Sequence, residues 1–402
     1  MLNNFSWREI LIRSALVFFC LVLWRHGLNQ IAIPALTLAW IIDGGLQRFG
    51  QVIKEPLVHA ILVFCVVLLL GLLWSDYPDG GRMKWKKYFI LLTFIPFFSL
   101  LNKSRLPCVI AALLVGYFSV VFIGVYQWII LDQQGVSIFG MSYLSFSAML
   151  GVGVILASYL ALTVQVKMLK TFFLILALAL FFVQFHQNAR GLILATLCTL
   201  TFLVFLLYRV EVKRVVVVLA SLTIVISIFA FNSTVLQERF IQVKHDIELL
   251  QQGNYNSSVG YRIAIWDVGI DGIAKKPWLG HGTGMPVSYF ENTILTYKGG
   301  LYKELPAFQR TTHYHNDWIE IGMHLGLLGI LALSFLFWSW YRLFKVHQLP
   351  TLGATLVCYI FLAGLTDCFI LYNRIPILLL VITAITIIWQ RETQKNKGPC
   401  KC

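Results

Sequence analysis

Long apolar runs separated by short polar breaks fill most of the chain. Most of these runs hold about 16 to 25 residues, close to the roughly 20 that an α-helix needs to cross a bilayer. We therefore predict an all-α polytopic membrane protein with about twelve transmembrane helices, the first, second and fourth of them short. The predicted spans lie near residues 10–24, 28–42, 57–74, 88–101, 108–130, 141–165, 169–184, 191–208, 214–232, 317–341, 351–371 and 375–390.

One long polar stretch, residues 233–316, interrupts this pattern between the ninth and tenth spans. Its first part, Val235 to Leu250, repeats apolar residues at helical spacing among charges and predicts an amphipathic helix on the membrane surface. A second helix is expected from Tyr261 to Lys276, stopped by Pro277. The chain should therefore divide into spans 1–9 (1–232), a large loop domain (233–316), spans 10–12 (317–390) and a tail (391–402).

The composition of the 402-residue chain agrees with this class of protein. Hydrophobic residues make up 58% of it, charged residues only 12%, and its mean hydropathy is +0.77. Soluble domains are less apolar. No small-residue cleavage site follows the first apolar run, so we expect a retained transmembrane helix and not a signal peptide.

The formal net charge of +14 does not indicate a nucleic-acid partner, because the cations lie mostly at helix ends and not in one patch. If the N-terminus is cytoplasmic, the positive-inside rule places the C-terminus on the same side and the long loop on the outer side. The basic cluster Arg82–Lys87 is an exception, because it then lies outside. It indicates either an error in the span count or an anionic partner at the outer face.

Three side chains on the outer side form a candidate site. Arg190 lies at the mouth of the eighth span, Arg262 lies in the long loop, and His315 lies where this loop meets the tenth span. Two guanidinium groups suit a phosphate or pyrophosphate, and a histidine is a suitable proton acceptor near neutral pH. Taken singly, each arginine could instead bind lipid headgroups, and the histidine could cap or pack a helix.

The helix expected after His315 carries further candidates. Gly322, Gly326 and Gly329 share one face with His315 at helical spacing, and small residues there let a neighbouring helix approach closely. Glu320 lies within the same predicted span. It either belongs to a buried polar cluster that supports the histidine or acts as a second base.

Other polar residues give weaker signals. Asp367 also lies within a predicted span, and Arg374, one heptad on, could pair with it. The glycine-rich segment Gly280–Gly284 follows no predicted strand, so we expect no nucleotide there. Neither an HExxH motif nor a suitable cysteine spacing accompanies the histidines, so we expect no metal ion.

Several motifs together resemble the O-antigen ligase (WaaL) family, within the wider Wzy and O-antigen ligase-like superfamily. The similar segments are Asn188–Gly191, Arg262-x-x-x-Trp266, Lys276–Gly284, and His315–Asn316 followed by Gly322, Gly326 and Gly329. By motif the resemblance extends from about residue 186 to residue 330, and by span count and loop placement it extends over the whole chain.

The resemblance implies a metal-independent glycosyltransferase without cofactors, at the periplasmic face of a Gram-negative inner membrane. Its donor would be an O-polysaccharide on undecaprenyl pyrophosphate, and its acceptor a sugar hydroxyl of lipid A-core. By position, Arg190 and Arg262 would hold the donor pyrophosphate, and His315 would take the acceptor proton in an inverting transfer. Supporting positions would be Tyr261, Trp266, Asn316 and Glu320.

The sequence leaves other functions open. A Wzy-type polymerase would use the same donor chemistry, although such enzymes often have two large outer loops. A protein O-oligosaccharyltransferase usually has more chain after its last spans. A secondary transporter can also have twelve spans, but that class shows repeated halves with broken helices near the membrane midplane, whereas the polar groups of this chain gather at one face.

Overall fold

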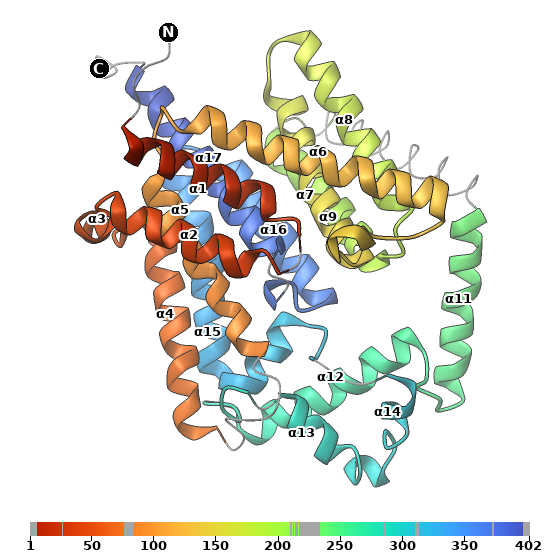
Figure 1. The fold of residues 1–402 in the computed structure, drawn as a ribbon. Helices are drawn as coiled ribbons and strands as arrows, with labels where there is room; N and C mark the ends of the chain where they lie inside the picture. The colour runs from red at the N-terminus through yellow and green to blue at the C-terminus, as the bar shows by residue number, and fades with distance from the viewer. Residues whose placement is uncertain are drawn as a thin grey trace.

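The computed structural model describes residues 6–25, 27–75, 84–209, 211, 213, 216, 234–284, 286–309, 313–371 and 374–396, and these residues form helices joined by turns (Figure 1). Within these ranges the only extended pairing is one isolated bridge, between Val136 and Met141. The predicted all-α fold is confirmed. The bundle helices are α1 (Trp7–Val22), α2 (Asn29–Ile42), α3 (Gly45–Val52), α4 (Pro56–Leu70), α5 (Phe94–Leu100), α6 (Leu106–Leu131), α7 (Tyr143–Thr163), α8 (Lys167–Phe185), α9 (Arg190–Tyr208), α15 (Asp317–Val346), α16 (Pro350–Thr366) and α17 (Arg374–Asn396).

Within the described ranges, seven helices are long and apolar enough to cross a membrane, as expected for a multi-pass membrane protein. They are Pro56–Trp74, Leu106–Leu131, Tyr143–Thr163, Lys167–Phe185, Arg190–Tyr208, Asp317–Val346 and Arg374–Lys395. Two shorter apolar helices, Gln30–Ile42 and Pro350–Thr366, also match predicted spans. The predicted ninth span, 214–232, lies outside the described residues apart from position 216, so the number of twelve stays a prediction.

Local sequence explains where several of these helices begin. Pro56 and Pro350 occupy the first turn of α4 and α16, where a missing N–H costs nothing. Ser142 caps α7, since its hydroxyl accepts a hydrogen bond from the backbone N–H of Ser145. The predicted fourth span begins differently, because residues Lys84–Thr93 form a 3₁₀-helix that continues into α5.

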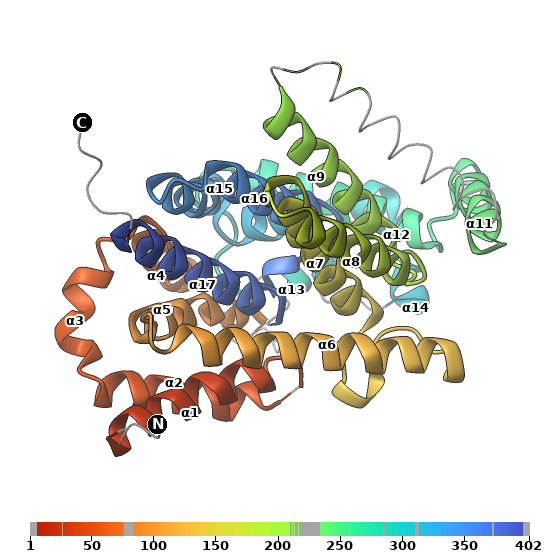
Figure 2. The same ribbon diagram turned by 90° about the horizontal axis from the view of Figure 1, so that it is seen from above.

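The helices form two groups that face each other across the bundle. Seen from above, α1, α2 and α6 lie along one side, and α9, α15 and α16 lie along the other (Figure 2). Helices α5, α7 and α17 lie between them, and a single cluster of buried apolar side chains runs through the bundle. The second group matters for function, because it carries the candidate site.

Helix α15 is broken at Gly326, whose φ of +57° and ψ of −143° are outside the helical range. In a continuous helix Trp318 and Phe337, nineteen positions apart, would be separated by about 28 Å along the axis. Their ring centroids are in fact 5.8 Å apart. The segment 317–325 therefore folds back along the segment 327–346, and the uninterrupted helix expected after His315 is a helical hairpin.

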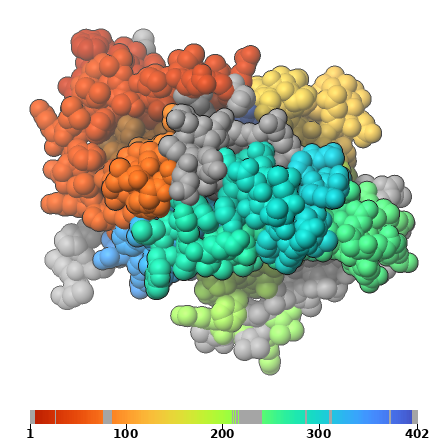
Figure 3. Space-filling model, turned by 90° about the horizontal axis from the view of Figure 1, so that it is seen from below, coloured from red at the N-terminus to blue at the C-terminus, as the bar shows by residue number. Residues whose placement is uncertain are grey.

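The loop segment (residues 234–309) forms a second, smaller core. It contains α11 (Thr234–Gln251), α12 (Ser258–Lys275), α13 (Pro286–Thr293), a 3₁₀-turn (Tyr297–Gly299) and α14 (Leu305–Phe308). Buried residues of this core include Ile265, Phe290 and Tyr302, together with Met323 from the first half of α15. Seen from below, the loop segment covers the centre of the molecule (Figure 3). The two predicted loop helices correspond to α11 and α12.

Candidate active site

His315 lies in the short connection that leads into α15. Its backbone φ of +47° is in the left-handed region that residues other than glycine rarely adopt. The next residue, Asn316, caps the helix, since its Oδ1 accepts hydrogen bonds from the backbone N–H groups of Trp318 (2.9 Å) and Ile319 (3.2 Å). The helix begins at Asp317, so His315 precedes it and does not share the helical glycine face that the spacing predicted. Such strained residues concentrate at functional sites.

The imidazole of His315 is paired with a buried carboxylate. Its Nδ1 lies 3.1 Å from Oδ1 of Asp367, the residue that ends α16 and is 1% exposed. The Nε2 of His313 lies 2.8 Å from the same oxygen, which also accepts the backbone N–H of Cys368 at 2.8 Å. Because a carboxylate only accepts hydrogen bonds, the proton of a neutral His315 is on Nδ1. Its Nε2 is then left with a lone pair that can take a proton.

Burial and hydrogen bonding set the charge states of this pair. Burial favours the neutral form of Asp367, but the hydrogen bonds from His313 (2.8 Å) and His315 (3.1 Å) stabilise its charged form. Burial lowers the pKa of His315, and the charges of His313 and Arg262 act in the same direction, while Asp367 opposes them. A neutral imidazole beside an ionised carboxylate results, which is the combination a general base requires.

Helix α12 brings two predicted residues to His315. Tyr261 is buried, and its ring meets the imidazole edge-on with 6.0 Å between the centroids. Arg262, the next residue on the helix, is half-buried, and its positive charge is among the causes that lower the pKa of His315. The helix is positioned by Ser257, whose hydroxyl accepts the backbone N–H of Gly260 at 3.0 Å.

Arg190 reaches the same region from α9. It is the first residue of that helix, its side chain is exposed, and it donates a hydrogen bond to Oε1 of Gln242 on α11. A Cβ built on the neighbouring Gly191 would lie 2.8 Å from Cβ of Thr366, the residue before Asp367. The start of α9 is thus packed against the end of α16, which brings Arg190 to the neighbourhood of the His315–Asp367 pair.

The remaining predicted residues hold the connection around His315 in place. Trp266 donates its indole N–H to the carbonyl oxygen of Tyr314 at 2.9 Å. Glu320 is buried, and its Oε2 accepts the backbone N–H of Tyr314 at 2.9 Å. Its other oxygen lies 3.6 Å from Nε2 of His324. The structure therefore supports the interpretation of Glu320 as part of a buried polar cluster.

The glycine-rich segment after α12 docks into the break of α15. The carbonyl groups of Pro277 and Trp278 accept the backbone N–H groups of Leu327 (2.7 Å) and Leu328 (3.2 Å). In return, the N–H groups of His281 and Gly282 donate to carbonyl groups at the end of the first half-helix, at 2.9 Å each. These bonds satisfy backbone groups that the break would otherwise leave unpaired. The glycine-rich segment was visible in the sequence, but its docking against the break in α15 was not predicted.

Asp367 is the site residue that the sequence analysis assigned differently. Arg374, its expected partner, instead donates to the carbonyl oxygens of Phe139 (2.8 Å) and Gly140 (3.0 Å). An acidic residue within an apolar span is energetically costly and therefore indicates a functional role. This feature of the sequence could have identified Asp367 as a site residue. Its partners were not predictable, because they lie more than fifty positions away in sequence.

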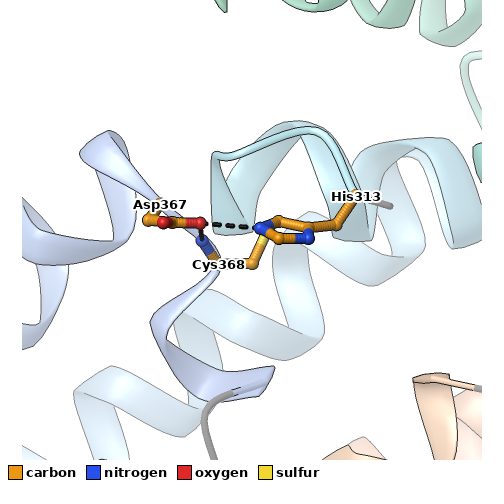
Figure 4. Close-up of side chains that lie close together, drawn as sticks. All are labelled: His313, Asp367 and Cys368. Carbon is orange, nitrogen blue, oxygen red and sulfur yellow. Dashed lines mark hydrogen bonds and ion pairs between the residues drawn. The ribbon is translucent and has the colours of Figure 1, made fainter. Parts of the chain in front are cut away.

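One group of side chains at the site could hold a metal ion. His313, Asp367 and Cys368 each offer one ligand atom, and these atoms lie within 4.8 Å of one another (Figure 4). Such a mixed nitrogen, oxygen and sulfur set suits zinc. A bound cation would be coordinated by the Asp367 carboxylate, which is also the hydrogen-bond partner of His315. It would therefore compete with the His315–Asp367 pair.

The fold and the site together define an all-helical, multi-pass membrane protein with a histidine–carboxylate pair at a helix boundary. Residues 174–334 match the family model described as O-antigen ligase. This match includes Arg190, Arg262 and His315 and ends before Asp367. An O-antigen ligase of Escherichia coli (strain K12) is 27% identical over 187 residues, which are 46% of this chain and 42% of that relative.

These matches confirm the resemblance to the O-antigen ligase family. The alignment covers less than half of the length of the curated relative. The region 174–334 contains the loop segment, the break of α15 at Gly326 and all seven predicted site residues. It therefore includes most of the candidate active site.

Proposed function

We propose that this protein is a lipopolysaccharide O-antigen ligase. It would transfer O-polysaccharide from undecaprenyl pyrophosphate to a sugar of lipid A-core at the periplasmic face of the Gram-negative inner membrane, with both termini in the cytoplasm. The observation that carries the proposal is the contact of 3.1 Å between His315 Nδ1 and Asp367, close to the charge of Arg262. This arrangement supports a role for His315 as the base that takes the acceptor proton, and a role for Arg262 as a cation that binds the leaving group.

The reaction needs one proton transfer and one displacement. Nε2 of His315 takes the proton of the acceptor hydroxyl, and Asp367 stabilises the imidazolium that forms. The acceptor oxygen bonds to the anomeric carbon of the donor while the bond from that carbon to the pyrophosphate oxygen breaks on the opposite face. The configuration of the anomeric carbon is therefore inverted.

The leaving group departs as undecaprenyl pyrophosphate with its negative charge increased. Arg190 and Arg262 would bind its oxygens through their planar guanidinium groups and offset this charge. Pyrophosphate is already a good leaving group, so the transfer requires neither a metal ion nor a cofactor. Tyr261, Trp266, Asn316 and Glu320 would keep the base and the arginines in place.

The test is the lipopolysaccharide of cells that lack this gene, complemented with wild-type, His315→Ala or His245→Ala protein. His245 is an exposed residue of α11 and serves as the control. We expect bare lipid A-core and accumulated lipid-linked polymer in the deletion strain and with His315→Ala, and normal lipopolysaccharide with the other two. A core that carries single repeat units would instead identify a polymerase. Normal ligation by His315→Ala would exclude His315 as the base.

A further inference from the structure

Two histidines and a cysteine surround the buried carboxylate of Asp367. Nε2 of His313 lies 2.8 Å from Asp367 Oδ1, and Nδ1 of His315 lies 3.1 Å from the same oxygen. The Sγ atom of Cys368 lies within 4.8 Å of the ligand atoms of His313 and Asp367 (Figure 4). The proton transfer described above uses His315 and Asp367, and it assigns no role to the thiol of Cys368.

The fold brings these four side chains together from two connections. His313 and His315 lie in the connection that leads into α15, and their ring centroids are 4.1 Å apart. Asp367 and Cys368 follow α16, where the carbonyl oxygen of Asp367 accepts the backbone N–H of Phe369 at 3.0 Å. This bend lets two consecutive side chains reach the same histidine (Figure 4). Spacing along the chain does not reveal the set, because His313 and Asp367 are 54 positions apart.

The ligand atoms have the composition that zinc prefers. Zinc binds imidazole nitrogen, thiolate sulfur and carboxylate oxygen, usually through four atoms in a tetrahedron. His313, Asp367 and Cys368 supply three such atoms. Nδ1 of His315, beside the same carboxylate, is a fourth. Magnesium and calcium prefer oxygen ligands, so the thiol and the imidazoles favour zinc over both.

The charges of this set also match a divalent cation. Asp367 and Cys368 are 1% and 0% exposed, and an unbalanced charge is costly at such a depth. One carboxylate and one thiolate balance the two charges of zinc, and the histidines bind as neutral ligands. The thiol of Cys368 gives its proton to solvent when the zinc–sulfur bond forms. The side chains of His313 and His315 are 13% and 14% exposed, so a cation can reach the set over them.

We propose that these four side chains form an inhibitory zinc site. The inhibitory effect rests on the function proposed above, whereas zinc binding itself does not. A neutral histidine that ligates zinc through Nδ1 carries its proton on Nε2, so His315 then has no lone pair for the acceptor proton. Zinc also neutralises Asp367, which otherwise stabilises the imidazolium. The same side chains therefore serve either proton transfer or zinc binding.

Cobalt(II) reports the site directly, because it replaces zinc at such ligands and absorbs in the near-ultraviolet when a thiolate binds it. The parent protein for the titration has serine at both tail cysteines, Cys400 and Cys402, so that the tail does not bind the metal. We expect stoichiometric cobalt to produce the thiolate band in the parent and in Cys65→Ser, and no band in Cys368→Ser. Cys65, a buried free cysteine of α4, is the matched control. Zinc should remove the band, and magnesium should not.

Glycan transfer measures the inhibition, with each variant compared with its own rate without zinc. Zinc should inhibit the parent and Cys65→Ser, and EDTA should restore the rate. Half-inhibition of Cys368→Ser should need more than about tenfold more zinc, since the loss of even an indirect partner of a metal ligand typically costs that much affinity.

The outcomes separate this inference from the proposed function. Absence of the thiolate band in the parent, or a band that persists in Cys368→Ser, would overturn the zinc site and leave the ligase assignment in place. The spectrum of the parent is informative even if Cys368→Ser folds poorly. Equal half-inhibition of the parent and Cys368→Ser would overturn the inhibitory role. A band that depends on Cys368 in a protein that transfers no glycan would support the zinc site and overturn the proposed function.

Discussion

Replacement of Asp367 by asparagine tests the chemistry of the site most directly. The change keeps the size of the side chain and its acceptor oxygen but removes its charge. In the wild-type protein that oxygen lies 3.1 Å from Nδ1 of His315 and 2.8 Å from Nε2 of His313. The carboxylate stabilises the imidazolium in the transition state far more than it stabilises the neutral imidazole, so the substitution should lower kcat.

The size of the loss follows from the geometry. Unit charges separated by 3.1 Å interact by about 5 kcal/mol at an effective dielectric constant of about 20. The asparagine dipole and local relaxation recover part of this, which leaves a loss of roughly 2–3 kcal/mol. We therefore expect kcat to fall roughly 30- to 160-fold. The upper part of this range reaches the lower limit of the roughly 10²- to 10⁴-fold that a general base contributes, as expected for a residue that supports the base and does not replace it.

The pH dependence gives a second readout with a defined sign. His315 must be neutral to act as a base, and Asp367 raises its pKa against the effect of burial. Without the carboxylate the pKa of His315 falls further, so the acid limb of the kcat/KM profile should move to lower pH while the plateau drops. A structural defect alone would lower the plateau without moving the limb.

The assay is glycan transfer from a purified lipid-linked donor by protein in detergent, measured across pH. Asp267→Asn is the matched control, because Asp267 accepts hydrogen bonds from Lys298 (2.6 Å) and Tyr302 (2.8 Å) in the loop segment. The control should retain wild-type kcat. A kcat of Asp367→Asn within twofold of wild type, with an unchanged acid limb, would refute the role of Asp367.

Three further predictions address the arginines, the broken helix and the metal ligands. Arg262→Lys should raise the donor KM and lower kcat/KM more than tenfold, since lysine cannot bind pyrophosphate through two parallel bonds; kinetics near wild type would contradict this. Gly326→Ala should lower the melting temperature, because a Cβ there would lie 2.5 Å from the Pro277 carbonyl oxygen at a strained φ, whereas Gly50→Ala, with nothing within 4 Å, should be neutral or slightly stabilising. EDTA should leave the transfer rate unchanged, and added zinc should inhibit it less in Cys368→Ser than in wild type; loss of activity with EDTA would indicate a required metal ion.

Much of the fold could be predicted from the chain alone. Each predicted span within the described residues has a helical counterpart, and the two loop helices were placed within a few residues of α11 and α12. Hydrophobic periodicity and length are local properties, and a bilayer makes them decisive because backbone groups must be satisfied within the helix. Arg190, Arg262 and His315 were also identifiable as candidates, because polar and charged side chains next to apolar helices are costly unless they bind a partner.

The tertiary structure decided what these residues do together. The helix expected to be continuous is a hairpin at Gly326. The carbonyl groups of Pro277 and Trp278 accept the backbone N–H groups that the break leaves unpaired. This pairing cannot be predicted from composition. Asp367 belongs to His315 and not to Arg374, because α16 ends against the connection that carries the histidine. Helix formation depends on neighbours a few residues apart, and so it can be predicted from sequence. The site depends on contacts between α9, α12, α15 and α16, which only the packing of the bundle determines.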